Sequence, residues 1–509
     1  MNPPPVVLAE SGVGYRQYRI PALALTRGGT LVSAYDGRPD LDDLPAPIDL
    51  LVRSSRDGGR TWSPQRVARR AVGLTGYGDP SLLADRVTGR LWCFHAAGSG
   101  VGFFESSEGT ADDDPAVLHC DAAFSDDEGV TWASRRLTAE LRAGLNARLA
   151  ASADPRLAGR RVRGLFAASG AGAQVVQGPH TGRLLQGFVA LIGAELWVVV
   201  ARSDDHGRTW TLGDPLGPGA NESALAALPD GRVLLHSRAP GRRLQAFSLD
   251  GGETFGPLGA ADDLPDPGNN GSLLALPDGT LLASHTADPD LRRRLVLSRS
   301  TETGESWAPA VELTAGGAGY SVAVALPDGA VGVLWEDGGY RRLLFARVDP
   351  DAAAGPSCEQ DSPDLCAAPA PTAVLEHVIP ARPEGWIEVG ESVELELDAD
   401  DYDDAVFKIV AGDGGRQRVA TRAAYARNLG PLHRGLAAGD TLVWAARLPA
   451  QHGGAVVRRG LRHVVTAADV AAGVVRLDGG AVGLSGAQAD VRAEIPIHPH
   501  PPLEDACTR

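Results

Sequence analysis

The chain has 509 residues and a formal net charge of −16, and 43% of its residues are hydrophobic. A chain of this length exceeds what one hydrophobic core usually supports, so two or more domains are expected. Because nucleic acids and anionic membranes require a basic surface, the acidic balance argues against either as the main partner.

No stretch of the sequence is long and apolar enough to span a bilayer, so no integral membrane segment is expected. The N-terminal residues Met1–Pro5 lack the charged and hydrophobic regions of a secretory signal. The chain as given is therefore expected in the cytoplasm, or outside the cell if an export signal was trimmed and replaced by a start methionine.

A short motif of the form Ser-x-Asp-x-Gly-x-Thr-Trp occurs five times, the last time in a degenerate form. Ser and Asp side chains bind nearby backbone amides, Gly supplies the turn conformation, and the aromatic residue anchors the turn to a core. The motif therefore predicts a hairpin turn at each copy. The copies cover residues 55–62, 125–132, 203–210, 248–255 and 300–307.

A second turn motif, Leu-Pro-Asp-Gly, interleaves with the first, and a β-type apolar run follows each copy. Its copies are about 50 residues apart, which matches the ~40 to 50 residues of a four-stranded propeller blade. Two turn motifs in one shared phase predict a β-propeller, with about six or seven blades in residues 1–350. The copies begin at Leu228, Leu276 and Leu326.

The organisation changes near residue 350. Residues 351–372 have the composition of a linker, rich in Ala and Pro. Residues 373–509 alternate apolar and polar positions without the turn motif, which predicts a smaller accessory β domain of sandwich type. Because aromatic residues are few there, a role in packing or oligomerisation is favoured over carbohydrate binding.

Five cysteines leave one unpaired in any full pairing. Cys358 and Cys366 are close enough in sequence for a local disulfide, and two free thiols explain the spacing equally well. Cys93 and Cys120 lie in β-type sequence and are expected to be buried packing residues.

Three arginines and one tyrosine stand in short distinctive contexts. They are Arg19 in Tyr-Arg-Ile-Pro, Arg238 in His-Ser-Arg, Arg292 at the start of an arginine run, and Tyr320 in Gly-Tyr-Ser. Guanidinium groups bind carboxylates through forked, charge-assisted hydrogen bonds. Arginines that converge on one small ligand therefore predict a substrate with a fixed negative charge, such as a sugar acid. The alternative, a solvated surface position, fits most of the other arginines.

The N-terminal 350 residues resemble the catalytic domain of the bacterial sialidase (neuraminidase) family, the six-bladed β-propeller exo-α-sialidases. The five-copy motif resembles the aspartate box of this family, although that box also builds turns in non-catalytic propellers. The resemblance implies a six-bladed propeller, and the alternating pattern beyond it adds the smaller β domain, so the whole chain is expected to be all-β. Six further segments carry the resemblance: Tyr18–Pro21, Ser33–Pro39, Tyr77–Ser81, Asn221–Ser223, His236–Arg238 and Gly319–Ser321.

The resemblance also implies roles for individual residues. A sialic acid carries a carboxylate on its anomeric carbon, so an anionic nucleophile would be repelled, and sialidases use a tyrosine instead. Tyr320 is implied as this nucleophile. A phenol with a pKa of ~10 needs a base to react near neutral pH, and Glu222 is implied as that base. One hairpin is expected to deliver both Glu222 and Arg238 to the site.

A loop after the first arginine is expected to supply the acid. Asp43 is implied as the general acid and later the base for water, with Asp42 as its rival. Arg38 and Asp79 resemble positions that contact the carboxylate or C4 region and the acylamino group of the substrate. Asp36 and Arg38 could instead tie a turn to each other.

The combined interpretation is a retaining exo-α-sialidase that removes terminal sialic acid from glycoconjugates. A sialylated glycan is then the partner, no metal or organic cofactor is required, and protein partners are left open. Two alternatives remain: a hydrolase of a related nonulosonic or ulosonic acid, and a non-catalytic sialic-acid-binding propeller. The substrate carboxylate is expected on Arg19, Arg238 and Arg292.

Overall fold

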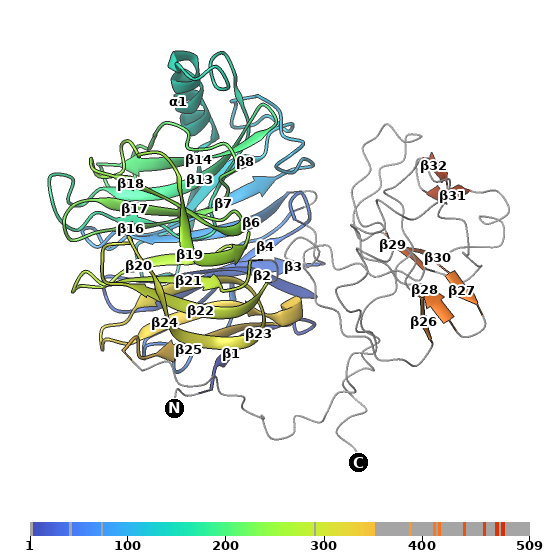
Figure 1. The fold of residues 1–509 in the computed structure, drawn as a ribbon. Coiled ribbons are helices and arrows are strands. Elements are labelled where there is room, and N and C mark those ends of the chain that lie inside the picture. The colour runs from blue at the N-terminus through green and yellow to red at the C-terminus, as the bar shows by residue number, and fades with distance from the viewer. Residues whose placement is uncertain are drawn as a thin grey trace. The chain divides into compact units, whose positions relative to one another are not determined.

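The computed structural model describes residues 4–39, 43–72, 75–289 and 292–351, together with seven short strands between residues 386 and 483. The chain divides into two compact units, residues 1–358 and 359–509. Strands dominate the described residues, with one α-helix, α1 (Thr138–Ala151), and one 3-10 turn, η1 (Gly338–Tyr340) (Figure 1). The predicted all-β class is therefore confirmed.

The described residues of the first unit form five sheets. Two have four strands: β2 (Gln17–Leu25), β3 (Leu31–Arg38), β4 (Asp49–Ser55) and β5 (Arg66–Arg69) form one, and β16 (Ser223–Ala227), β17 (Val233–Ser237), β18 (Pro240–Ser248) and β19 (Gly259–Pro267) form the other. Two have five strands: β11 (Gly170–Ala171), β6 (Gly76–Ala84), β7 (Leu91–Gly98), β8 (His119–Ser125) and β9 (Ala133–Arg136), and then β10 (Val162–Ala167), β13 (Leu184–Ile192), β14 (Glu195–Ser203) and β15 (Thr211–Leu212), with β12 (Ala173–Gln174) paired to β13. The seven-stranded sheet consists of β20 (Ser272–Ala275), β21 (Leu281–Thr286), β22 (Arg293–Ser300), β23 (Ala308–Ala325), β24 (Val331–Asp337), β25 (Arg342–Val348) and β1 (Val6–Glu10).

The seven-stranded sheet is continuous because β23 is 18 residues long. Its first part, Ala308–Gly317, pairs with β22, and its last part, Ala318–Ala325, pairs with β24. The N-terminal strand β1 pairs with β25 and so joins the beginning of the unit to its end. The sheets have a propeller-like arrangement whose edges are protected by this closure. The predicted number of six blades stays a prediction. The strand β23 belongs to both halves of the seven-stranded sheet, and each half has the size of one blade.

The second unit contains only short strands among its described residues. Its predicted limits, a linker at 351–372 and a sandwich at 373–509, stay predictions, and Cys358 and Cys366 lie outside the described residues. The described strands are β26 (Trp386–Glu388), β27 (Ala411–Asp413), β28 (Arg416–Arg418), β29 (Thr441–Val443), β30 (Arg462–Val464), β31 (Val474–Leu477) and β32 (Gly480–Gly483).

The five-copy motif forms the turn that its residues predict. In the first copy, the Gly59 amide donates to Ser55 Oγ at 2.8 Å, and the Thr61 amide donates to Asp57 Oδ1 at 2.9 Å. The Trp62 indole donates to the Gly59 carbonyl at 3.1 Å. The Ser, Gly and Thr bonds recur around Asp127, Asp205 and Asp250. These four copies are therefore self-contained turns that need no contact with a binding site.

The innermost strands have two different ends. The last residues of β2, β6, β16, β20 and β23 line an apolar cavity of about 380 Å³, and two of the Leu-Pro-Asp-Gly turns lie beside it. Arg19 and Asp79 lie in the first halves of β2 and β6, and Glu222 directly precedes β16. Tyr320 lies within β23, four residues before Val324 of the cavity lining. A strand advances about 3.3 Å per residue, so four residues separate the two places by roughly 13 Å. The polar residues therefore gather away from this cavity.

Cys93 and Cys120 are free and buried, which confirms their predicted packing role. Burial raises the pKa of the Cys120 thiol to about 12, so it stays protonated and apolar. Among the residues that the structure describes, no helix has the length and apolar character needed to cross a membrane.

Candidate active site

Three arginines from distant parts of the chain surround one phenol ring. The Cζ atoms of Arg19, Arg238 and Arg292 lie 5.5, 5.7 and 5.4 Å from the centre of the Tyr320 ring. Arg19 belongs to β2, Arg238 directly follows β17, and Arg292 directly precedes β22. Arg19 and Arg292 are only 3% and 2% exposed, so both are buried beside the ring. Such a cluster is suited to hold a small anion.

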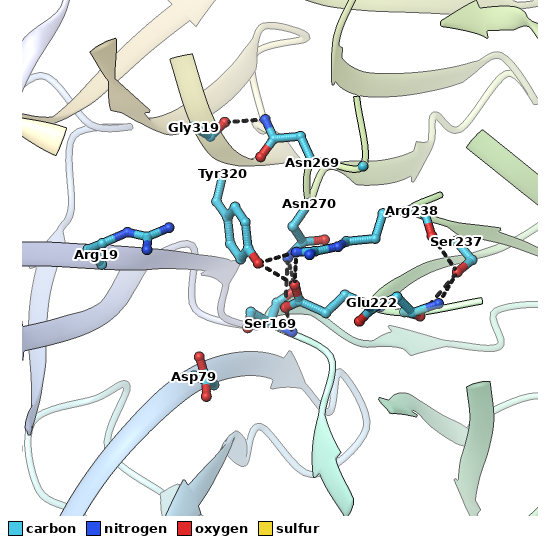
Figure 2. A network of polar contacts seen from close by, with 12 residues as sticks. Arg19, Asp79, Ser169, Glu222, Ser237, Arg238, Asn269, Asn270, Gly319 and Tyr320 are labelled. Carbon is cyan, nitrogen blue, oxygen red and sulfur yellow. Dashed lines mark hydrogen bonds and ion pairs between the residues drawn. The ribbon is translucent and has the colours of Figure 1, made fainter. Parts of the chain in front are cut away.

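The phenol and a carboxylate form the centre of the site (Figure 2). The Tyr320 hydroxyl donates to Glu222 Oε2 at 2.5 Å, and both side chains are buried. Arg238 donates to the same Oε2 at 2.8 Å and also contacts the Tyr320 hydroxyl. A carboxylate in this position can accept the phenolic proton, while the guanidinium stabilises negative charge on the phenol oxygen.

One hairpin delivers Glu222 and Arg238, as its sequence predicts. β16 and β17 pair with Ser223 opposite Ser237, and the Arg238 amide donates to the Glu222 carbonyl at 2.9 Å. Glu222 and Arg238 are therefore neighbours across the mouth of the hairpin. The Ser169 amide, just before β11, donates to Glu222 Oε1 at 3.3 Å.

A buried glutamate that the sequence reasoning missed supports the arginine cluster. Glu336 Oε1 accepts from Arg19 Nε at 3.1 Å, and Glu336 Oε2 accepts from Arg19 Nη2 at 3.3 Å. The same carboxylate accepts from the backbone amides of Ile20 at 2.7 Å and Tyr320 at 2.9 Å. Every residue of β24 is buried. A charged residue within its apolar run is unusual, and this feature of the sequence could have identified Glu336.

Tyr340 is a second residue that the motifs did not identify. Its hydroxyl accepts from Arg292 Nη1 at 2.8 Å, and its ring lies 4.1 Å from Arg19 Cζ. Tyr340 thus contacts two of the three arginines, one through a hydrogen bond and one through a cation–π contact. It lies in η1, whose short sequence carries no motif that points to this role.

Two strained backbone positions lie on strands that contribute to the site. Ile20 and Asp79 have φ angles of 59° and 61°, and each lies where the pairing register of its strand shifts. Each precedes a proline, Pro21 or Pro80, which cannot donate to a ladder. Bulges of this kind redirect side chains, at about 1 to 3 kcal/mol of local strain. Asp79 points toward the site from β6 (Figure 2).

The remaining predicted residues form an ion-pair cluster. Arg38 Nη1 donates to Asp43 Oδ1 at 2.7 Å, and Arg38 Nη2 donates to Asp36 Oδ2 at 2.7 Å. Asp79 Oδ1 lies 4.0 Å from Arg38 Nη2. Arg38 is therefore bonded to Asp36, as one of its two predicted roles requires, and it also faces Asp43 and Asp79. Its contact with the substrate stays a prediction. The rival acid, Asp42, lies outside the described residues.

Burial changes the acidity of this cluster. It raises the pKa of Asp36 to about 6, although Arg38 opposes the shift. Burial, followed by the carboxylates of Asp36 and Asp43, raises the pKa of Asp79 well above its ordinary value. A protonated Asp79 can donate a hydrogen bond to a ligand oxygen. Asp43 differs from both, because its side chain is 66% exposed on a loop and can meet an incoming ligand.

Within the described ranges, no group of three or more His, Cys, Asp or Glu side chains has an arrangement that could hold a metal ion. The positively charged groups that the described site offers to an anion are its arginines.

Comparison with known proteins identifies the family. A family model described as a BNR repeat-like domain matches residues 29–333, more than half of the chain. A sialidase of Micromonospora viridifaciens is 41% identical over 341 residues, which cover 64% of this chain and 50% of that protein. A sialidase of Bacteroides fragilis is 25% identical over 359 residues, covering 64% of this chain and 62% of that protein. The chain thus spans half to about three-fifths of the length of these two relatives.

Solved structures agree in fold. The Hadza microbial sialidase Hz136 matches with a TM-score of 0.60 and 26% identity, covering 69% of each chain. The intramolecular trans-sialidase of Ruminococcus gnavus matches with a TM-score of 0.57 and 20% identity, covering 69% of this chain and 98% of that one. The chain therefore belongs to the BNR repeat-like domain family, and its predicted membership of the bacterial sialidase family is confirmed.

Proposed function

We propose that the chain is a retaining exo-α-sialidase, a glycoside hydrolase that releases terminal sialic acid from glycoconjugates. The observation that carries the proposal is the hydrogen bond from Tyr320 to Glu222 at the focus of three arginines. A sialidase substrate has a carboxylate on the carbon under attack. A tyrosine that loses its proton only during attack avoids the repulsion that a permanently charged nucleophile would meet.

In the first step, the substrate carboxylate binds Arg19, Arg238 and Arg292. The Tyr320 oxygen attacks the anomeric carbon while its proton passes to Glu222 Oε2. The glycosidic bond breaks, and the leaving oxygen takes the proton of Asp43. The arginines stabilise the substrate charge through the oxocarbenium-like transition state.

In the second step, water attacks the anomeric carbon and gives a proton to Asp43. The bond to the Tyr320 oxygen breaks, and the phenol recovers its proton from Glu222. Two inversions at one carbon leave the configuration retained. Each residue thereby returns to its starting protonation state without a cofactor.

A non-catalytic binding propeller would use the arginines but would have no need of a phenol bonded to a carboxylate. The Tyr320–Glu222 bond therefore favours catalysis over binding alone.

The test is release of 4-methylumbelliferone from its α-sialoside by wild type and Tyr320→Phe. Turnover by wild type and a loss of at least about a hundredfold in the variant are expected, since a nucleophile and its proton transfer are removed. NMR of the first product formed should show the retained anomer. No turnover of any sialoside by wild type, or equal rates for the two proteins, would overturn the proposal.

A further inference from the structure

One loop contacts Glu222 and also Gly319, the residue that precedes Tyr320 (Figure 2). It lies between β19 and β20 and carries Asn269 and Asn270, which are 0% and 2% exposed. Asn269 Nδ2 donates at 2.8 Å to the carbonyl of Gly319, the residue before Tyr320. Asn270 Nδ2 donates to the Ser169 carbonyl at 3.0 Å and lies 3.4 Å from Glu222 Oε1, within donating range.

The loop is itself held by a buried ion pair. Arg243 Nη1 donates to Asp266 Oδ2 at 3.1 Å, and both side chains are 0% exposed. The same nitrogen donates to the Asn269 carbonyl at 3.2 Å. Asp266 Oδ1 accepts from the amides of Gly268 at 2.8 Å and Asn269 at 2.6 Å. Because a buried charge is costly unless it is paired, this ion pair ties the loop to β18.

The two oxygens of Glu222 consequently have different surroundings. Oε1 faces two neutral donors, the Ser169 amide and the Asn270 side chain. Oε2 faces the Tyr320 hydroxyl and the Arg238 guanidinium. With Oε1 held, the carboxylate plane is fixed so that Oε2 points at the phenol.

Other charges also act on this carboxylate. Asp79 on β6 interacts electrostatically with Glu222, and Arg19 and Arg292 lie around the ring of Tyr320. None of these three side chains makes a described hydrogen bond to Oε1. Oε1 of Glu222 is therefore held by the Ser169 amide and by Asn270, while Tyr320 and Arg238 hold Oε2.

We propose that Asn270 is a positioning residue, which holds Glu222 so that Oε2 exchanges the proton of Tyr320. Asn269, through its bond to the Gly319 carbonyl, fixes the backbone next to Tyr320 relative to Glu222. The proposal deepens the proposed function and rests on it. Asn270 touches neither the reacting carbon nor the leaving group in this scheme, and it acts through Glu222.

The decisive variant is Asn270→Asp, which is nearly isosteric. It replaces a neutral donor with a carboxylate about 3.4 Å from Oε1, and two carboxylates at such a distance share a proton. Glu222 would then keep its proton to higher pH. In a plot of kcat against pH, the midpoint of the fall on the acid side is expected to move to higher pH by about one unit or more.

Asn270→Ala and Asn270→Ser separate orientation from charge. Loss of the donor in Asn270→Ala should lower kcat by about 10- to 100-fold, because small misplacements cost rate, while KM stays within about threefold. Asn270→Ser keeps a shorter donor and should recover part of the loss. If Asn270→Ala does not fold, as judged by its melting curve, Asn270→Ser and Asn270→Asp carry the test.

A second readout does not depend on turnover. The tyrosinate absorbance of each protein is titrated with pH, and the same titration of its Tyr320→Phe partner is subtracted, which isolates Tyr320. Asn270→Asp should move the Tyr320 titration to higher pH. Asn146→Asp on α1 is the matched control, because Asn146 Oδ1 only accepts from the Val162 amide, at 3.0 Å.

The outcomes are distinct. A shift in both the acid-side midpoint of kcat and the Tyr320 titration, absent from Asn146→Asp, supports the positioning role. Profiles of Asn270→Asp that coincide with those of Asn146→Asp overturn it. A shifted Tyr320 titration in a protein that turns over no sialoside overturns the proposed function while supporting the contact between Asn270 and the Tyr320–Glu222 pair.

Discussion

Glu336 binds Arg19 through both of its carboxylate oxygens, at 3.1 and 3.3 Å. The same carboxylate accepts the Tyr320 amide, so one buried charge sets the positions of an arginine and of the phenol that it faces. The contact spans 317 residues of sequence and joins β2 to β24. The site is consequently sensitive to changes that never touch a substrate.

Glu336→Gln keeps the shape of the side chain and removes its charge. A buried arginine left without its counter-charge typically costs about 3 to 5 kcal/mol, so a clear fall in melting temperature is expected. The KM for a sialoside should rise, because Arg19 is no longer held. Thermal unfolding and steady-state kinetics check both effects. Glu128→Gln, which loses only hydroxyl partners at Thr26 and Thr30, should change KM little.

Gly319→Ala tests how closely the chain approaches Glu336. A Cβ at Gly319 would lie 2.2 Å from Glu336 Oε2 and 2.9 Å from the Tyr340 ring, so the carboxylate must move. We expect a loss of kcat/KM of about tenfold or more, since the shift is passed to Arg19 and Tyr320. Gly316→Ala is the matched control, because its Cβ would meet only Thr314 Oγ1 at 3.5 Å. Equal activity in the two variants would contradict the role assigned to Glu336.

Arg292→Lys and Arg293→Lys change neighbouring residues, and only the first is expected to lower kcat/KM strongly. Arg292 faces the site, whereas Arg293 is paired with Asp288 near the surface. Lysine keeps the positive charge but cannot form the two parallel hydrogen bonds that a guanidinium makes to a carboxylate. A hydrogen bond to a charged group contributes about 1.5 to 3 kcal/mol. Arg292→Lys should therefore lower kcat/KM by about 10- to 100-fold, and Arg293→Lys by less than about twofold. The reverse order would show that the wrong arginine of the run was assigned to the substrate.

His95 makes the fold sensitive to acid. Burial lowers the pKa of His95 to about 4, from 6.5 when exposed. Between these two pH values His95 is protonated in the unfolded chain and neutral in the folded chain. The free energy of unfolding therefore falls as the pH drops from 6.5 to 4. His95→Gln should reduce this slope while matching the wild-type slope above pH 7. Urea unfolding at several pH values measures it, and an unchanged slope would mean that His95 is not buried as a neutral ring.

Asp127→Ala separates turn stability from activity. The Asp127 carboxylate accepts from the Thr131 amide and hydroxyl, and the Thr131 hydroxyl is the leading cause that lowers the pKa of Asp127 to about 2. Its removal should cost about 1 to 2 kcal/mol of stability. The kcat/KM for a sialoside should stay at the wild-type value. A large loss of activity without a loss of stability would place this turn closer to the chemistry than its own bonds indicate.

The sequence identified the local parts of the molecule. The turn motif contains its own donors and acceptors, so Asp57 and its equivalents form the expected turns wherever they occur. The motifs around Arg19, Glu222, Arg238, Arg292 and Tyr320 also named residues that do meet in one place. The number of blades, the accessory domain and the Cys358–Cys366 pair stay predictions.

Only the tertiary structure decided how these residues are held. Glu336, Tyr340 and the two asparagines belong to no motif, because their roles come from hydrogen bonds with residues between 16 and 317 positions away. Turn formation depends on side chains within one short segment, and the sequence contains that information directly. The orientation of Glu222 and of the arginines depends on which strands the closed ring of sheets brings together, and that is a property of packing.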